Sequence, residues 1–96
     1  MRPSIALANQ KAAVQAATTK FRAANPRIFG SVLKGADADG SDLDILVDAL
    51  PGATLFDLGA LQITLEQLLG VRVDVLTPGD LPVSLRDAVL AEAQPI

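Results

Sequence analysis

Two aspartates one residue apart, Asp42 and Asp44, have the types and the spacing to do chemistry. They open the apolar stretch DLDILVDA at residues 42–49, and on a β-strand residues i and i+2 project from the same face about 7 Å apart. Two like charges side by side are unfavourable unless a positive group lies between them. Oxygen ligands suit Mg²⁺ or Mn²⁺, so the pair predicts a divalent metal site.

Two further features suggest a larger site. A third carboxylate, Asp74, lies in the alternating stretch VRVDVLT at residues 71–77. If this strand pairs beside the first, all three acids converge, as in sites that hold two metal ions for phosphoryl or nucleotidyl transfer. Gly30 and Ser31 follow a short apolar segment and begin a turn, whose free N–H groups and hydroxyl predict a phosphate site.

Hydrophobic periodicity predicts the elements that must position these residues. Residues 4–24 have the spacing of an amphipathic helix, which Asn25-Pro26 should end because a residue before proline avoids helical geometry. RIFGS at residues 27–31 predicts a short buried strand, and VLKG at residues 32–35 predicts about one helical turn. The polar segment that follows, residues 35–41, predicts an exposed loop in which Asp37 and Asp39 are solubilising charges.

The strand of the paired acids alternates between two faces. Its periodicity assigns Leu43, Ile45 and Val47 to the core and places Leu46 on the same face as the acids. Asp48 shares that face but lies roughly 13 Å beyond Asp44 at the rise of a strand. We expect it to be solvated and outside the site.

Two more helices follow, each with an expected capping signature. Thr54 with Asp57 opens the first, which Gly70 ends, and Ser84 with Asp87 opens the second, which Pro95 ends. Their expected buried faces comprise Leu58, Leu61, Leu65 and Leu68 in the first and Leu85, Ala88 and Val89 in the second. Residues 1–96 therefore predict one α/β (α+β) domain with a small mixed three-stranded sheet and about four helices.

Composition excludes several classes of function. The chain has no cysteine and no histidine, which removes disulfide frameworks, thiol nucleophiles, zinc sites and His-based triads. Its net charge of −3 gives no general attraction to nucleic acid. No stretch approaches the ~20 apolar residues of a membrane helix, and Asn9, Gln10 and Lys11 interrupt any signal-peptide core. We expect a cytoplasmic protein without a membrane partner.

The order of these motifs along the chain is more specific than any one of them. FGSVLKG, SDLDILVD, VRVDVLT and the ending SLRDAVLAEAQPI together resemble the minimal nucleotidyltransferases of the DNA polymerase β superfamily, over nearly the whole chain. The resemblance implies the nucleotidyltransferase fold. It also implies an enzyme that binds a nucleoside triphosphate with Mg²⁺ and transfers the nucleotidyl group to a hydroxyl.

Residue roles follow from the same resemblance. It implies that Asp42 and Asp44 hold two metal ions, and that Asp74 completes the ion that activates the acceptor hydroxyl. It also implies that Gly30 and Ser31 bind the triphosphate. Many relatives have arginine where this chain has Val32, so Lys34 is the candidate for the missing positive charge. The catalytic and metal candidates are Asp42, Asp44 and Asp74, and the nucleotide-binding candidates are Gly30, Ser31 and Lys34.

Single-domain members of this length resemble antitoxins that are encoded beside HEPN-domain ribonuclease toxins. This implies a hetero-oligomer in which AMP passes from ATP to a toxin tyrosine. The chain contains no tyrosine, so the partner must supply that acceptor. Two alternatives stay open: an antitoxin that neutralises its toxin by contact alone, and an enzyme that modifies a small molecule such as an aminoglycoside.

Two other ligand motifs fit poorly. A calcium loop at residues 37–48 fails because Asp42 stands where an EF-hand needs glycine. A P-loop beginning at Gly35 fails because Ser41 stands where lysine is required.

Overall fold

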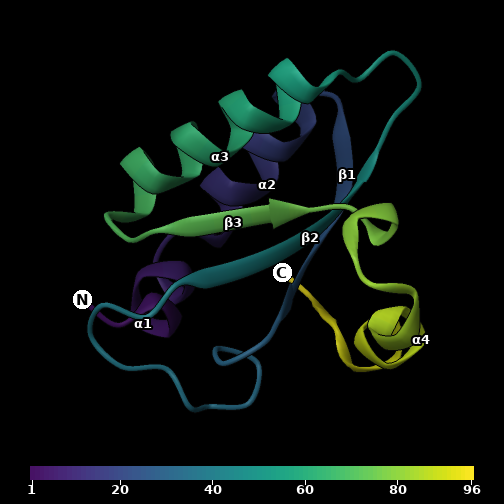
Figure 1. Cartoon of the computed structure of the whole chain (residues 1–96). Helices are drawn as coiled ribbons and strands as arrows, with labels where there is room; N and C mark the ends of the chain where they lie inside the picture. Colours follow the sequence, from purple (N-terminus) through teal and green to yellow (C-terminus); the bar gives the residue numbers. More distant parts are fainter.

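The computed structural model describes all residues, 1–96, and a mixed four-stranded sheet lies at its centre (Figure 1). The strand order is β3-β2-β1-β4. β1 (Ala23–Phe29) pairs antiparallel with β2 (Leu43–Ala49) and with β4 (Gln94–Pro95), whereas β2 pairs parallel with β3 (Val73–Leu76). The predicted mixed sheet is confirmed, with the two-residue β4 as an additional strand.

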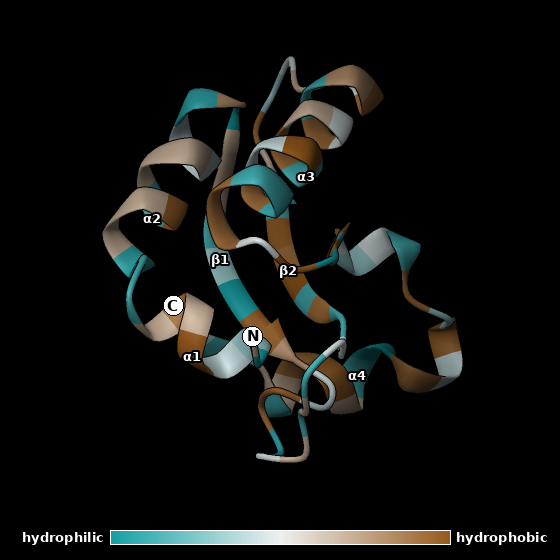
Figure 2. Cartoon of the chain, turned by 90° about the vertical axis from the view of Figure 1, so that its left-hand side faces the viewer, coloured by the Kyte–Doolittle hydropathy of each residue, from teal (hydrophilic) through white to brown (hydrophobic).

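Four α-helices and one 3₁₀ helix accompany the sheet. They are α1 (Pro3–Ala8), α2 (Lys11–Lys20), α3 (Leu55–Leu69), η1 (Pro78–Asp80) and α4 (Val83–Glu92). α3 contacts β3 and α2 contacts β1, while α4 lies away from both helices (Figures 1 and 2). None of the helices is long and apolar enough to span a bilayer.

The N-terminal part differs from the single helix predicted for residues 4–24. The helix is interrupted between Ala8 and Lys11, and the chain enters β1 at Ala23, where it pairs with Ala49 of β2. Proline is tolerated inside β1 because the register shifts between Ala24 and Arg27, so Pro26 interrupts no regular ladder. Sheet pairing thus overrides the helical propensity of the alanines.

The core lies between the sheet and helices α1 to α3. On β2, Leu43, Ile45 and Val47 are completely buried, as their alternation predicts. The alternation places Leu46 on the acids' face, yet it too is completely buried. η1 contacts β2, and Leu81 just after it is also buried, so the second face of the sheet is partly covered.

Helix α3 begins and ends as predicted. Thr54 and Asp57 form a reciprocal capping box, and Gly70 ends the helix with a left-handed φ of 69°. Its buried side chains are Leu61, Leu65 and Leu69, and the expected Leu58 and Leu68 are partly buried against the core.

The same helix also reaches the outer edge of β3. The backbone N–H of Val73 donates to Glu66 at 3.1 Å, and that of Val75 donates to Gln62 at 3.1 Å. Side chains of α3 therefore take the place of a further strand at these two donors.

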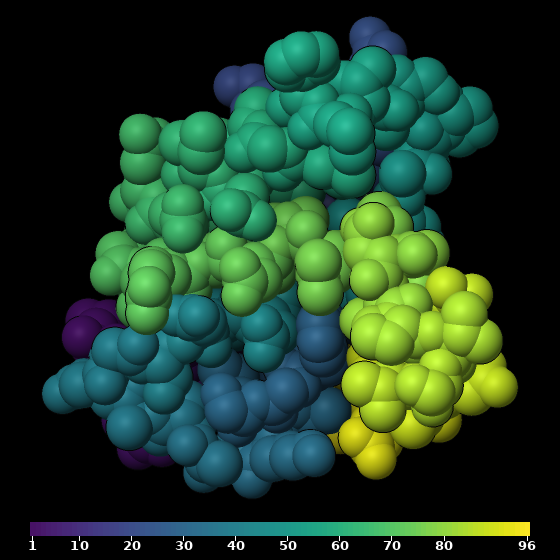
Figure 3. All heavy atoms as spheres, viewed as in Figure 1, coloured from purple at the N-terminus to yellow at the C-terminus, as the bar shows by residue number.

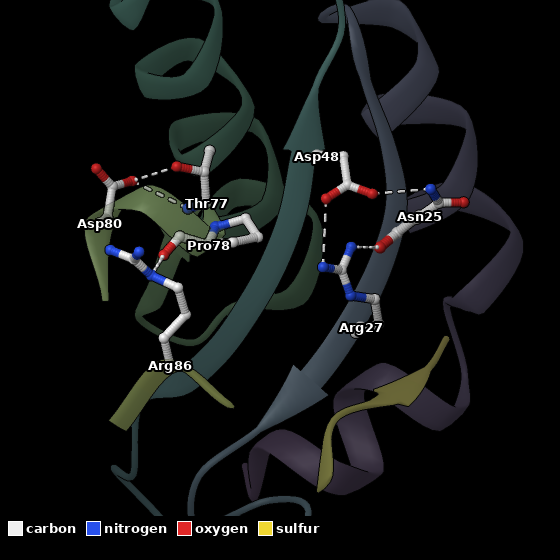
Figure 4. A network of polar contacts seen from close by, with 7 residues as sticks. All are labelled: Asn25, Arg27, Asp48, Thr77, Pro78, Asp80 and Arg86. Carbon is white, nitrogen blue, oxygen red and sulfur yellow. Dashed lines mark hydrogen bonds and ion pairs between the residues drawn. The ribbon is translucent and has the colours of Figure 1, made fainter. Parts of the chain in front are cut away.

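Helix α4 departs most from prediction. It begins at Val83 after Pro82, without a side-chain cap, because the chain is already helical at Ser84. None of its residues is buried. Arg86 instead ties it to the chain before it, donating from Nε to the Pro78 carbonyl at 2.9 Å and from a terminal nitrogen to the Leu81 carbonyl at 3.2 Å. Figure 4 shows the Pro78 contact beside the capping box of η1.

Candidate active site

The parallel pairing of β2 and β3 brings two of the predicted acids together. Leu43 pairs with Val73, and Asp44 pairs with Asp74. Since Leu43 and Val73 are buried in the core, their neighbours in the alternation project from the opposite face. Asp44 is half-buried there, whereas Asp74 on the outer strand is exposed.

The carboxyl group of Asp44 lies in surroundings that disfavour its negative charge. Burial raises the pKa of Asp44 above its ordinary value, and the negative charges of Asp74 and Asp42 raise it further. The ionised form is therefore disfavoured when no cation is present.

Asp42 lies one residue before β2 and pairs with a base. Its Oδ1 is 3.1 Å from Nε of Arg72. The contact has the distance of an ion pair but not the geometry of a hydrogen bond. Oδ1 is shielded from solvent and accepts no hydrogen bond. Arg72 reaches Asp42 because the two residues lie opposite each other in the register that pairs Leu43 with Val73.

The predicted phosphate turn begins beside Asp44. Phe29, the last residue of β1, pairs with Asp44, and Gly30 follows it with φ of 75°. A Cβ atom on Gly30 would overlap Oδ2 of Asp44. Only glycine lets this backbone and that carboxylate come so close.

The rest of the turn is a set of successive turns rather than the expected helical turn. The N–H of Lys34 donates to the Gly30 carbonyl at 3.2 Å, and the N–H of Ala36 donates to the Ser31 carbonyl at 2.9 Å. Ser31 is half-buried and Lys34 is exposed. Lys34 makes no ion pair within the chain, so its ammonium group is free to meet an anion.

These carboxylates fit a divalent cation in chemical type, although no three of them already stand close enough to hold one. They offer only oxygen, which suits Mg²⁺ or Mn²⁺. Oδ1 of Asp42 lacks a hydrogen-bond donor, and Asp44 is destabilised by two negative neighbours. A cation would relieve both.

Asp37 is not the solubilising charge that the sequence suggested. Its side chain is 1% exposed, and it accepts hydrogen bonds from the N–H of Ser4 at 3.0 Å and from Arg2 at 3.4 Å. The Ser4 N–H is the main cause that lowers the pKa of Asp37. It anchors the loop between the turn and the acids to α1. No local signal could have shown this, because the partners lie more than thirty positions away in sequence.

Asp48 lies outside the site, as predicted, but it is not simply solvated. It accepts a hydrogen bond from Asn25 at 2.8 Å and pairs with Arg27 at 3.3 Å (Figure 4). The Asn25 amide and the Arg27 charge lower the pKa of Asp48. These three residues line the larger of two hollows, about 510 Å³.

A smaller hollow of about 230 Å³ lies next to the acids. Ser41 and Arg72 line it, together with Met1, Gly40, Gly70 and Val71. Through Arg72 it adjoins Asp42, so it is closer to the candidate chemistry than the larger hollow. Figure 3 shows that the blue segment around residue 30, green β3 and yellow-green α4 meet on one face of the molecule.

Proteins from two archaea are similar to this chain in sequence. A relative from Methanocaldococcus jannaschii, named a putative protein adenylyltransferase, is 44% identical over 66 residues, which span 69% of this chain and 71% of the relative. Protein adenylyltransferase MntA of Thermococcus cleftensis is 38% identical over 65 residues, which span 68% of this chain and 66% of that protein.

Two solved structures have the same fold. One, described as a putative minimal nucleotidyltransferase, has a TM-score of 0.87 at 41% identity and covers 97% of this chain and 95% of its own. The other, described as a toxin-antitoxin with AMP-PNP, has a TM-score of 0.71 at 21% identity, over 91% of this chain and 69% of its own, and supports the fold alone. In sequence, residues 12–96 match the protein family described as the nucleotidyltransferase domain. The chain therefore belongs to the nucleotidyltransferase domain family and is an enzyme of that class.

Proposed function

We propose that this chain is an Mg²⁺-dependent protein adenylyltransferase that transfers AMP from ATP to a hydroxyl group of a partner protein. Family membership supports nucleotidyl transfer, and the names of two relatives support a protein acceptor. One observation carries the proposal: Gly30 of the turn lies against Asp44, which in turn pairs with Asp74. A triphosphate bound at the turn would thus lie directly beside the acids.

The turn is the proposed nucleotide site. The backbone of Gly30 and Ser31 approaches the phosphates without a side chain in the way, and the Ser31 hydroxyl can donate to them. Lys34, which is exposed and unpaired, contributes the positive charge.

The acids are the proposed metal ligands. Asp42 and Asp44 would hold two Mg²⁺ ions, with Asp74 a third ligand. When bound, these ions neutralise the carboxylates and stabilise the charge that develops on the attacked phosphate and on pyrophosphate.

Asp74 is also the proposed acceptor of the proton. It lies on the outer strand of the sheet and is exposed, so a hydroxyl group from solvent or from a partner can reach it. The hydroxyl oxygen forms a bond to the α-phosphorus while the bond to the pyrophosphate oxygen breaks. Asp74 takes the hydroxyl proton, and AMP remains on the acceptor.

The proposed partner is a HEPN-domain toxin, and the proposed acceptor is one of its tyrosines. The names of two relatives support a protein partner, and one structural neighbour is described as a toxin-antitoxin, which agrees with the resemblance that suggested a toxin. This chain has no tyrosine, so a tyrosine acceptor must come from another protein. The two proteins would form a hetero-oligomer in which this chain acts as the antitoxin.

The test is incubation of this protein with its partner, Mg²⁺ and labelled ATP, followed by mass spectrometry of both chains. We expect one or more AMP groups on the partner. The variant Asp42→Asn with Asp44→Asn should transfer none while still binding the partner. Asp87→Asn is the matched control, because it removes an exposed acid of α4 that pairs with nothing. Equal labelling by the double variant would refute the proposal.

Neutralisation by contact alone is the second candidate function. It predicts that the Asp42→Asn, Asp44→Asn variant protects cells from the toxin as well as the wild type does. Loss of protection with binding retained would exclude it. A small-molecule acceptor would instead appear as AMP incorporated without any partner protein present.

A further inference from the structure

Arg72 and Asp42 face each other where the two acid-bearing strands begin. The N–H of Leu43 donates to the carbonyl of Arg72 at 2.8 Å, which fixes the two strands side by side at this point. Nε of Arg72 then lies 3.1 Å from Oδ1 of Asp42. Neither Asp44 nor Asp74 forms an ion pair, so Arg72 supplies the one positive charge within ion-pair distance of the three acids.

The contact is close but easily released. Oδ1 of Asp42 is shielded from solvent and accepts no hydrogen bond, so its lone pairs remain available to another ligand. The side chain of Arg72 is 78% exposed, and it can therefore swing into water without losing buried contacts. An exposed ion pair of this kind changes an equilibrium by at most about fivefold.

We infer that Arg72 is an internal counter-ion that competes with the divalent cation for Asp42. This inference rests on the proposed function, since it takes Asp42 to be a metal ligand. In the metal-free protein Arg72 neutralises Asp42 and limits repulsion with Asp44. When the cation binds, Asp42 exchanges the guanidinium for the ion, and Arg72 is released to solvent at the rim of the smaller hollow.

Titration with Mn²⁺ alone, followed by calorimetry, tests this exchange. Arg72→Gln removes the competitor, so the Kd for Mn²⁺ should fall about two- to fivefold. Lys11→Gln is the matched control: it removes the same charge from an exposed residue that pairs with no acid, and the Kd should stay unchanged. An equal fall in both variants would mean that net charge, not this contact, sets the affinity, and would overturn the inference.

A second measurement needs no variant. In the ¹H–¹⁵N spectrum of the wild-type protein, the Nε–H signal of Arg72 should move on addition of Mg²⁺, toward the position of a solvated arginine. A signal that stays fixed at a Mg²⁺ concentration that saturates the site by calorimetry would overturn the inference and leave the proposed function standing. If the wild type binds neither cation, the metal site itself fails, and the inference fails with it.

Discussion

Gly30→Ala should damage both the stability of the protein and its transfer activity, because the new methyl group would enter the space of Asp44. Two costs add. An L-residue at φ of 75° costs about 1–2 kcal/mol. In addition, a Cβ would overlap Oδ2 of Asp44, so the carboxyl group must turn away. An off-rotamer side chain of this kind costs about 1 kcal/mol, and we expect a loss of about 2–3 kcal/mol in the free energy of unfolding.

The chain contains a matched control for this experiment. Gly35 has φ of 69°, yet a Cβ there would meet nothing within 4 Å. Gly35→Ala therefore carries the backbone cost without the overlap. Urea unfolding in EDTA should show Gly30→Ala to be less stable than Gly35→Ala by about 1 kcal/mol, and only Gly30→Ala should lose AMP transfer.

Truncation of the Asp44 side chain separates the cost of the overlap from the backbone cost. In the background of Asp44→Ala, the effect of Gly30→Ala on stability should shrink to that of Gly35→Ala, because the two altered groups no longer meet. If Gly30→Ala and Gly35→Ala were equally stable and equally active, the turn would not be held against Asp44. The proposed adjacency of nucleotide and metal sites would then be refuted.

Three further predictions concern charged residues. Asp44→Asn should raise the melting temperature at pH 7 in EDTA. The folded-state pKa of Asp44 is raised, so the wild-type protein loses stability as the pH rises through that pKa. Below about pH 3.8 the variant and the wild type should melt at the same temperature. Asp37→Asn should lower the melting temperature at pH 7. The folded-state pKa of Asp37 is lowered, so the ionised side chain stabilises the fold above pH 3.8 and this stabilisation is lost as the pH falls. At low pH the variant and the wild type should therefore melt at the same temperature. Arg86→Ala should cost about 1–2 kcal/mol in urea unfolding, because the Pro78 and Leu81 carbonyls each lose a charged donor; an unchanged midpoint would show that α4 is held by other contacts.

The sequence predicted the parts of the fold that depend on local periodicity. The alternation around Asp42 and Asp44 correctly predicted a strand and its core side, and the box at Thr54 correctly predicted the start of α3. The pairing of Asp44 with Asp74 could be expected because both acids follow a buried residue on neighbouring strands.

Features that depend on distant partners were beyond the reach of local patterns. Asp37 looks solvated in its loop, and only folding brings Ser4 against it. Leu46 shares the acids' alternation, yet it is completely buried, because η1 contacts β2 and part of the second face of the sheet is covered. The start of α4 was misplaced for a different reason: Ser84 and Asp87 have the spacing of a capping box, but Pro82 already accepts the first helical hydrogen bonds.

The outer edge of β3 also restricts how any other protein can attach. Intermolecular strand pairing uses outward amide groups, and here Glu66 and Gln62 already occupy those of Val73 and Val75. An incoming strand would first have to displace both side chains of α3. The sheet is thereby protected from growing by self-association at this side, and a binding partner must engage Asp74 through side chains rather than by extending the ladder.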